Sequence, residues 1–567
     1  MIDFARHFAA RVAQFERGCA RLRRAARASE DVVFFGDSLV EHNRGRIHAG
    51  GPVSAPWPDW FSQALGERAA RRQVRQHLRA MPVPDVRLRS LNDRPLRPER
   101  ELVLYWMTSF RRAQSNFALD RALEHARDLN KPLVVLEALR VGYPFASDRL
   151  HAFLLQGMAE NARRFGKSTV TYFPYVEERP GAGSGLLEAL AARACVVVGD
   201  DWPCFFVPRM QAAAAARLDV RVELVDSNGL YPMRATTRVF TTAHSFRVHL
   251  QKDLKKHLGA FPDEAPLRGL KLPAWEPPKE VLRRWPRASD ALLGADRDAL
   301  AQLPIDHTVT PVARVGGSAA ALGRVALFVE KKLADYAEAR NEPELDGTSS
   351  LSPWLHFGHV SVHEVFRAIA SKAGWSPDLL GRSIGGAKEG WWKLPPSTEA
   401  FLDELVTWRE LAFNMASHRP DDFTSFDSLP AFARQTLKAH EADPRPHLYS
   451  REQLEAGRTH DALWNATQMQ LVRDGWFHNY LRMLWGKKIL EWSRTPKDAL
   501  ATMEYLMGKY SLDGRDPVSW SGYLWVLGRY DRAWGPERPI FGKVRYMSSE
   551  NTARKVRVKD FMRRYAP

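Results

Sequence analysis

A run of hydroxyl groups marks the segment DGTSSLSPWLHFG, residues 346–358. Thr348, Ser349, Ser350 and Ser352 lie between an Asp-Gly turn and an expected helix over LHFGHVSVHEVF. Hydroxyls and unpaired backbone N–H groups at a helix N-terminus suit a pyrophosphate. An ordinary N-cap needs only one serine or threonine. The density of hydroxyls therefore favours a phosphate-binding loop over a simple helix cap.

A second segment, RDGWFHNYLRMLWGKKILEW at 473–492, combines arginine with tryptophan on one expected helix. Trp485 and Trp492 are seven residues apart, which is two helical turns and a rise of about 10.5 Å. They therefore share one face of the helix. Two tryptophans on a buried stripe explain this spacing at least as well as an electron path, so both interpretations stay open on periodicity alone.

The composition favours a polyanionic partner. The 567 residues carry a formal net charge of +17, with a pI near 9.8. Nucleic acid is the first candidate partner and an anionic membrane surface the second, while an arginine-rich composition typical of a GC-rich genome explains part of the excess. The three cysteines, Cys19, Cys195 and Cys204, show neither metal spacing nor a disulfide framework.

The length predicts two or three domains. No apolar run reaches the roughly 18 residues of a membrane span, and the N-terminus lacks the apolar core of a signal peptide. We therefore expect a cytoplasmic protein. Residues 1–88 are predicted to form an arginine-rich extension. Within it, VVFFGDSLVEHN at 32–43 is similar to the nucleophile block of GDSL hydrolases, with Ser38 as the serine. That block needs a downstream Asp-x-x-His pair in the same domain, so a strand followed by a turn is favoured.

Apolar segments alternate with expected helices from residue 101 onward. The segments are LVLYWM (102–107), PLVVLEAL (132–139), STVTYF (168–173), CVVVGD (195–200) and VRVELVD (220–226). This alternation predicts a doubly wound parallel sheet, a Rossmann-like α/β domain over 89–230. The glycines of GAGSG at 181–185 indicate either a turn or a phosphate site, and the turn is favoured. Residues 231–335 are predicted as a linker and the start of a helical region, and 336–567 as an all-helical domain.

Four blocks together resemble the FAD-binding region of the photolyase–cryptochrome family. They are YAEARNEPELDGTSSLSPWLHFG (336–358), WRELAFN (408–414), GWFHNYLRM (475–483) and LDGRDP (512–517). The resemblance implies FAD as cofactor and the following contacts to it: Tyr336, Thr348, Ser349, Ser350, Leu351, Ser352, Arg409, Asn479, Arg482 and Asp513. A flavin that carries charge as a reduced anion needs a fixed cation near its ring. Arg482 can supply that cation, oriented by Asp513.

Further stretches resemble the class II cyclobutane pyrimidine dimer photolyases, among them THDALWNATQMQLV (459–472), LWGKKILEWS (484–493) and ERPIFGKVRYM (537–547). This resemblance implies light-driven repair of such dimers. By position, Trp485 would lie nearest the flavin, and Trp464 and Trp492 would relay an electron toward the surface. Glu404 would hydrogen-bond the pyrimidine carbonyls, between walls formed by Trp408 and Trp525. Glu404 and Trp408 are four residues apart, so both can face one cavity of a helical domain.

The implied partner is damaged DNA with the dimer flipped out of the duplex, as in other enzymes that act on bases. We expect a monomer, and a second, antenna chromophore of the deazaflavin or folate type is possible in the α/β domain. Two positions depart from the class II pattern: Met507 replaces an asparagine near flavin N5, and Glu364 replaces a basic residue. These departures motivate an alternative, a cryptochrome-like blue-light photoreceptor without repair activity.

Overall fold

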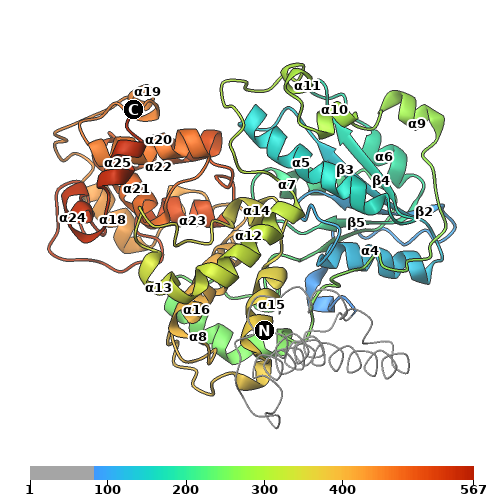
Figure 1. The fold of residues 1–567 in the computed structure, drawn as a ribbon, viewed down its shortest axis with the longest axis horizontal. Coiled ribbons are helices and arrows are strands. Elements are labelled where there is room, and N and C mark those ends of the chain that lie inside the picture. The colour runs from blue at the N-terminus through green and yellow to red at the C-terminus, as the bar shows by residue number, and fades with distance from the viewer. Residues whose placement is uncertain (1–81) are drawn as a thin grey trace, which may run out of the picture. The chain divides into compact units, whose positions relative to one another are not determined.

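The computed structural model describes residues 82–567, which include a six-stranded sheet in the order β1-β6-β5-β2-β3-β4. The strands are β1 (Leu88–Ser90), β2 (Leu102–Met107), β3 (Leu133–Leu139), β4 (Thr171–Val176), β5 (Ala194–Asp200) and β6 (Val222–Val225). Strands β2 to β6 are mutually parallel, and β1 pairs with β6 in the antiparallel sense. The predicted Rossmann-like sheet is confirmed (Figure 1). The short edge strand β1 is an addition to it.

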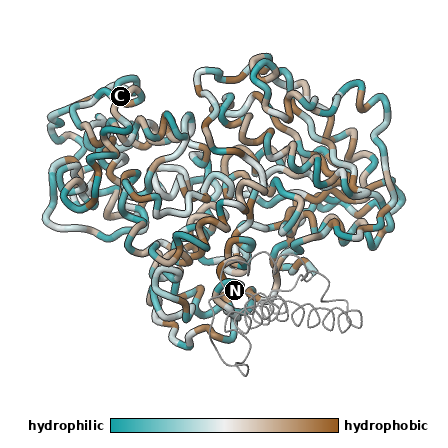
Figure 2. The backbone as a smooth tube through the Cα atoms, in the orientation of Figure 1, coloured by the Kyte–Doolittle hydropathy of each residue, from teal (hydrophilic) through white to brown (hydrophobic). Residues whose placement is uncertain are grey.

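Helices cover both faces of this sheet. They are α4 (Phe117–Asp128), α5 (Asp148–Phe165), α6 (Leu186–Ala191) and α7 (Val207–Ala215). Along β2, Val103 and Tyr105 join the core that contains α4, whereas Leu102 and Leu104 join the core that contains α6 and α7. Burial of alternate residues on opposite faces makes each parallel strand an almost continuous apolar run, visible as hydrophobic colour along the strands in Figure 2.

The order of the strands creates a switch point. The chain runs from β2 through β3 to β4 in one direction and then returns to β5 on the other side of β2. In open parallel sheets, ligands bind outside the carboxyl ends of the strands where the order reverses. A cavity occupies this part of the molecule, as described below.

The remainder of the described chain is helical, as predicted. Its longer helices are α8 (Ala243–Asp253), α12 (Ser318–Lys331), α15 (Val362–Ala373), α17 (Arg409–His418), α18 (Ala431–Ala439), α20 (Ala462–Asp474), α21 (Asn479–Trp492), α22 (Pro496–Tyr510) and α23 (Pro517–Val526). Its shorter helices are α9 (Lys279–Arg284), α10 (Asp290–Leu293), α11 (Arg297–Ala301), α13 (Tyr336–Ala339), α14 (Ser352–His356), α16 (Pro396–Leu402), α19 (Arg451–Glu455), α24 (Ser549–Lys555) and α25 (Lys559–Arg564). Within residues 82–567 no helix is both long and apolar enough to cross a bilayer. Ser38 lies outside the described residues.

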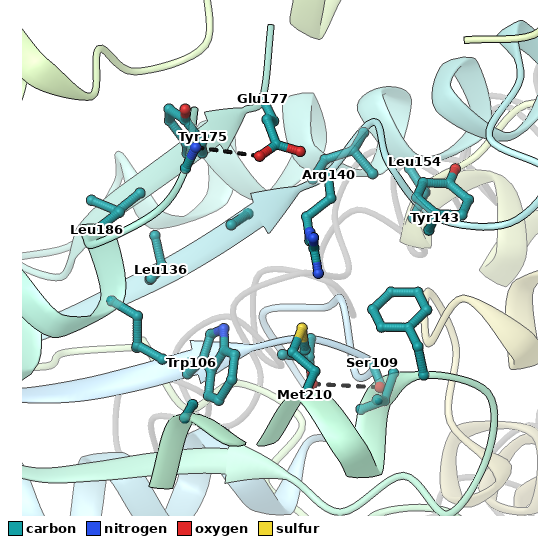
Figure 3. Close-up of a pocket in the computed structure, with 18 of the residues that line it drawn as sticks. Trp106, Ser109, Leu136, Arg140, Tyr143, Leu154, Tyr175, Glu177, Leu186 and Met210 are labelled. Carbon is teal, nitrogen blue, oxygen red and sulfur yellow. Dashed lines mark hydrogen bonds between the residues drawn. The ribbon is translucent and has the colours of Figure 1, made fainter. Parts of the chain in front are cut away.

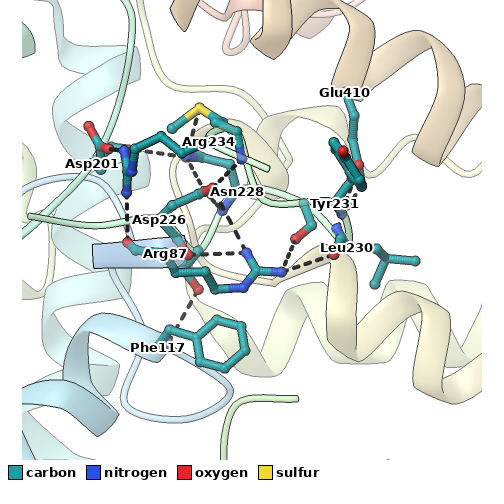
Figure 4. A network of polar contacts seen from close by, with 12 residues as sticks. Arg87, Phe117, Asp201, Asp226, Asn228, Leu230, Tyr231, Arg234 and Glu410 are labelled. Atoms are coloured by element: carbon teal, nitrogen blue, oxygen red, sulfur yellow. Dashed lines mark hydrogen bonds and ion pairs between the residues drawn. The ribbon is translucent and has the colours of Figure 1, made fainter. Parts of the chain in front are cut away.

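A buried polar network fixes α17 to the loop that follows β6 (Figure 4). Arg87 donates to the carbonyl oxygens of Gly229 at 3.1 Å and Leu230 at 2.9 Å. The carboxylate of Glu410 on α17 accepts from the backbone N–H of Leu230 at 2.7 Å and of Tyr231 at 3.0 Å. These bonds tie the edge of the sheet to the helix that follows Trp408.

Replacing Gly229 with alanine should destabilise the protein, because a Cβ there would lie 2.5 Å from the Glu410 carboxyl group. Glu410 cannot turn aside without releasing two buried backbone N–H groups, so we expect a loss of about 1–3 kcal/mol in the free energy of unfolding. Gly259→Ala is the matched control, since nothing lies within 4 Å of its Cβ position. Equal urea midpoints for the two variants would contradict this account.

Candidate functional site

The hydroxyl loop is held from one side by α12. Arg324 donates to the carbonyl oxygens of Ser349 at 2.7 Å and Thr348 at 3.1 Å, and it pairs with Asp346 at 3.1 Å. Ser350 takes a left-handed backbone conformation, with φ of 52°. Its hydroxyl lies 3.2 Å from that of Thr348. The loop carbonyls are thus occupied by a guanidinium, while the hydroxyls of Thr348 and Ser350 lie together.

The helix expected after this loop is divided in two, which corrects the sequence-based prediction. Helix α14 ends at His356 and α15 begins at Val362. Between them Gly358 has φ of +70°, and a Cβ there would lie 2.0 Å from the carbonyl oxygen of Ser109. The close approach of the sheet loop therefore requires glycine at this break. Because α14 is a single short turn, individual N–H and hydroxyl groups, rather than a long helix dipole, are available to a phosphate.

Glu364 forms a capping box at the start of α15. Its Oε2 accepts from the Ser361 backbone N–H at 2.8 Å, and the Ser361 hydroxyl accepts from the Glu364 N–H at 3.0 Å. Its other oxygen, Oε1, accepts from Gln114 of the α/β region at 3.2 Å. Glu364, which departs from the class II pattern, thus caps α15 and connects it to the α/β region.

Replacing Glu364 with alanine should lower the free energy of unfolding by about 1–2 kcal/mol, because the cap is lost and Gln114 loses its acceptor. Glutamine can keep the reciprocal cap with its one carbonyl oxygen, but its NH2 group then faces the Gln114 donor. Glu364→Gln should therefore lose less free energy of unfolding than Glu364→Ala, and fall between that variant and the wild type. A Gln variant as unstable as the Ala variant would instead indicate that the negative charge is what matters.

Asp513 connects the loop to α21. Its Oδ2 lies 3.7 Å from Arg482 Nη2, its Oδ1 accepts from the Ser511 hydroxyl at 2.5 Å, and the Ser352 hydroxyl also bonds its side chain. Burial opposes ionisation of Asp513, but Arg482 and the two hydroxyls outweigh that effect, and the net shift lowers its pKa. The predicted Arg482–Asp513 pair therefore exists as a largely buried ion pair that contacts the hydroxyl loop.

Tyr336, Arg340 and Glu404 form a second polar group. Arg340 donates to Glu404 Oε1 at 2.8 Å and lies 5.7 Å from the Tyr336 ring centroid. Burial raises the pKa of Glu404, while Arg340 acts in the opposite direction. Nevertheless 35% of the Glu404 side chain is exposed. Glu404 is thus partly desolvated yet still reachable from solvent.

Glu404 and Trp408 lie in a π-helical segment, η5 (Asp403–Trp408), instead of an ordinary α-helix. Such segments are rare and occur frequently at functional sites. Trp408 meets Tyr530 with 6.4 Å between ring centroids. Trp525, at the end of α23, is partly buried like Trp408, and α17 and α23 pack together. Helix α17, which begins directly after Trp408, therefore packs beside α23, which carries Trp525.

The three predicted tryptophans form one continuous stack. The rings of Trp464 and Trp485 are parallel, with an interplanar angle of 1° and centroids 6.5 Å apart. Trp464 meets Trp492 edge-on at 5.4 Å. The indole N–H of Trp464 donates to the Trp485 carbonyl at 3.0 Å, and that of Trp485 donates to Gln468 at 2.9 Å. Each position is thus fixed by packing and by a hydrogen bond or ring contact.

Phe477 connects this stack to the ion pair. Its ring centroid lies 5.4 Å from that of Trp485 and 5.0 Å from the guanidinium carbon of Arg482. At the other end, Trp492 contacts Tyr449 at 5.3 Å and the exposed His460 at 5.4 Å. The aromatic contacts therefore run from the hydroxyl-loop region toward the surface.

Arg409 and Asn479 are two further predicted contacts to the cofactor. The contacts of Arg409 in the structure are with parts of the protein other than the hydroxyl loop. Arg409 is buried, donates to the Asn228 carbonyl at 2.8 Å and lies 4.2 Å from the Phe413 ring. Asn479 is exposed at the first turn of α21, whereas Leu351 is buried beside the hydroxyls. Arg409 and Asn479 stay predictions as flavin contacts.

Sequence reasoning missed Arg324, Arg340 and Gln468. Arg340 follows Tyr336 by four residues and Gln468 follows Trp464 by four, so helical spacing offered a signal for both. Arg324 had no such signal, because its contacts with the loop span 24 and 25 residues, across the end of α12 and all of α13.

A cavity of about 460 Å³ lies at the carboxyl ends of β2, β3 and β4 (Figure 3). Trp106, Leu136 and Tyr175 line it from the sheet, and His356 and Arg515 line it from the helical region. The neighbouring glycine loop is a turn, as favoured from sequence. The backbone N–H groups of Gly181 and Gly183 bond Glu177 at 2.8 and 3.3 Å, so they are already occupied.

The fold and site define a class of protein in which a Rossmann-like α/β region is joined to a helical region with a tryptophan chain. No protein-family model matches the chain. Deoxyribodipyrimidine photo-lyase of Methanothermobacter thermautotrophicus is 34% identical over 483 residues, which cover 84% of this chain and 97% of that protein. The protein of the same name from Oryza sativa subsp. japonica is 35% identical over 471 residues, covering 80% and 85%.

The chain therefore belongs to the deoxyribodipyrimidine photo-lyase family, within the photolyase–cryptochrome group. A solved structure of a bacterial class III photolyase from Agrobacterium tumefaciens shares the fold, with a TM-score of 0.56 at 18% identity, over 82% of this chain and 86% of that one. Cryptochrome-1 of Sinapis alba is 29% identical over 235 residues, only 37% of this chain and 42% of that protein. The match to Cryptochrome-1 is thus weaker and partial.

Proposed function

We propose that this protein repairs cyclobutane pyrimidine dimers in DNA by light-driven electron transfer from FAD, as a deoxyribodipyrimidine photo-lyase. The observation that carries the proposal is the continuous contact from Arg482 through Phe477 to Trp485, Trp464 and Trp492. A buried aromatic path that begins beside a paired arginine suits delivery of electrons to a redox cofactor. The assignment to class II rests on the sequence motifs.

The residues present fit FAD. Arg482 Nε is buried and has no hydrogen-bond partner among the described residues, so it offers a donor to an anionic group. The hydroxyls of Thr348 and Ser350 would hold the phosphates, while Ser352 stays bonded to Asp513 and the Arg482–Asp513 pair would stand beside the ring. When bound, reduced and excited by light, FAD supplies the single electron that opens the cyclobutane ring.

We propose that a lesion recess is formed beside Glu404. A pyrimidine dimer presents carbonyl oxygens, and a carboxyl group with a raised pKa can be protonated and donate a hydrogen bond to them. Burial shifts the pKa of Glu404 in that direction. Trp408 and Trp525 would flank the flipped bases by stacking, which is worth about 1–3 kcal/mol per base.

We further propose that the cavity of about 460 Å³ in the sheet region takes a planar second chromophore of the deazaflavin or folate type. Its aromatic and aliphatic walls suit a flat ring, and Arg140 projects into it (Figure 3). Residues 89–230 would then form the antenna domain, 231–335 the linker and 336–567 the catalytic domain, in a monomer.

The test uses the purified full-length protein. Its absorption spectrum should show flavin, and illumination of the reduced protein should cleave dimers in an oligonucleotide, whereas a photoreceptor of cryptochrome type would leave them intact. Glu404→Leu should retain flavin but repair more slowly, because the hydrogen-bond donor to the pyrimidine carbonyls is lost. A colourless protein that takes up no FAD would refute the proposal.

A further inference from the structure

Lys487 is a fully buried lysine beneath one proposed wall of the lesion recess. It lies on α21 and its side chain is inaccessible to solvent. Its ammonium donates to the carbonyl of Val526 at 2.5 Å and lies 5.1 Å from the ring centroid of Trp525. The adjacent Lys488 pairs instead with Glu491 at 2.9 Å. The ammonium of Lys487 thus contacts a backbone carbonyl and an indole face rather than a carboxylate.

The close packing of α21 against α23 builds this position. A Cβ on Gly486 would lie 2.5 Å from Val526 and 3.1 Å from Met503, so glycine allows the two helices to approach. Burial lowers the pKa of Lys487 to about 7. Burying an ammonium in this way is costly, and an apolar residue would fill the same space without that cost. A role for the charge explains why a lysine stands here.

We propose that the ammonium of Lys487 acts through Trp525 to stabilise the extra electron that the lesion carries during repair. This inference rests on the proposed function. One electron passes to the dimer, the two carbon–carbon bonds that link the bases break, and the electron returns to the cofactor, with no net proton transfer. Lys487 is a positioning residue in this scheme, because the indole of Trp525 separates it from the lesion.

The charge of Lys487 is close enough to the proposed lesion site to stabilise the reduced lesion measurably. A base stacked on the other face of Trp525 would lie roughly 9 Å from the ammonium, where a unit charge favours the reduced lesion roughly tenfold or more at an effective dielectric constant near 20. Two other charges face this position. Arg545, 5.8 Å from the Trp525 ring, is paired with Asp531 at 2.8 Å. These two largely neutralise one another, so Lys487 supplies the net positive charge behind the wall.

The first test measures repair at pH 6, where a lysine with a pKa of about 7 is mostly protonated, by chemically reduced, full-length enzyme carrying Lys487→Met. The yield of cleaved dimers per absorbed photon should fall roughly tenfold, while the affinity for a dimer-containing oligonucleotide in the dark stays unchanged, because the unreduced lesion is uncharged. Lys488→Met is the matched control and should repair like the wild type. A wild-type yield from Lys487→Met, or equal losses of yield and dark affinity, would overturn the inference. Failure of the wild type itself to repair would refute the proposed function.

The second test requires no repair. Protonation of an amine against an indole face changes the absorption of that indole. The wild-type protein should therefore show a tryptophan difference spectrum with a midpoint near pH 7, and Trp525→Phe should lack it. A lysine that keeps one charge state across this pH range would leave the spectrum of Trp525 independent of pH. Absence of the transition in the wild type would contradict the inference.

Discussion

Replacing Trp464 with phenylalanine should reduce the light-driven reduction of bound, oxidised flavin to near background. Trp464 lies between the other two tryptophans, with ring centroids 6.5 Å from Trp485 and 5.4 Å from Trp492. Phenylalanine preserves most of the packing but is far harder to oxidise than an indole. The remaining pair is separated by two turns of α21, a rise of about 10.5 Å, without an aromatic bridge.

The measurement is the loss of oxidised-flavin absorbance under blue light with an external reductant. Trp485→Phe should behave in the same way. Both variants should still repair dimers once reduced chemically, because in the proposed mechanism the chain serves only to reduce the cofactor beforehand. Trp375→Phe is the matched control, since Trp375 is equally buried but packs against Trp392 and Phe366. Normal photoreduction in Trp464→Phe would show that electrons take another path.

The tryptophan chain illustrates what periodicity can and cannot predict. The seven-residue spacing predicts that Trp485 and Trp492 share one face of α21, and in the structure both rings contact Trp464. That Trp464, from α20, inserts between them depends on how two helices pack, which no local pattern encodes. The family motifs supplied its position, and the parallel stacking and the bond to the Trp485 carbonyl come from the structure alone.

The sheet was the most predictable part of the fold, because buried parallel strands read as apolar runs separated by helices. Strand β1 was missed since three residues on an edge leave little pattern. The single helix expected over 355–366 was wrong, because Gly358 is needed where the loop after β2 passes close by. Helical spacing placed Glu404 and Trp408 on one face, but it could not reveal that the turn between them is a π-helix.

Replacing Asp513 with alanine should have the largest effect on the cofactor site. Asp513 is 3% exposed and is shared by Arg482, Ser511 and Ser352. Removing one partner of a buried ion pair leaves an uncompensated charge and costs about 3–5 kcal/mol. The free energy of unfolding should fall by that amount, and the purified variant should lose flavin, since the hydroxyl loop and the arginine are no longer held together.

Stability would be measured by urea unfolding and flavin retention by the absorbance ratio of the purified protein. Asp219→Ala removes a carboxylate of the same kind whose pair with Arg100, at 2.6 Å, is at the surface with 63% of the Asp219 side chain exposed. Exposed pairs contribute about 0–1 kcal/mol, so this control should keep both stability and flavin. If Asp513→Ala matched Asp219→Ala in both measurements, the pair with Arg482 would not organise the site. Selective loss of flavin at unchanged stability would instead assign Asp513 to direct contact with the cofactor, because a carboxylate that only orients Arg482 must also affect folding.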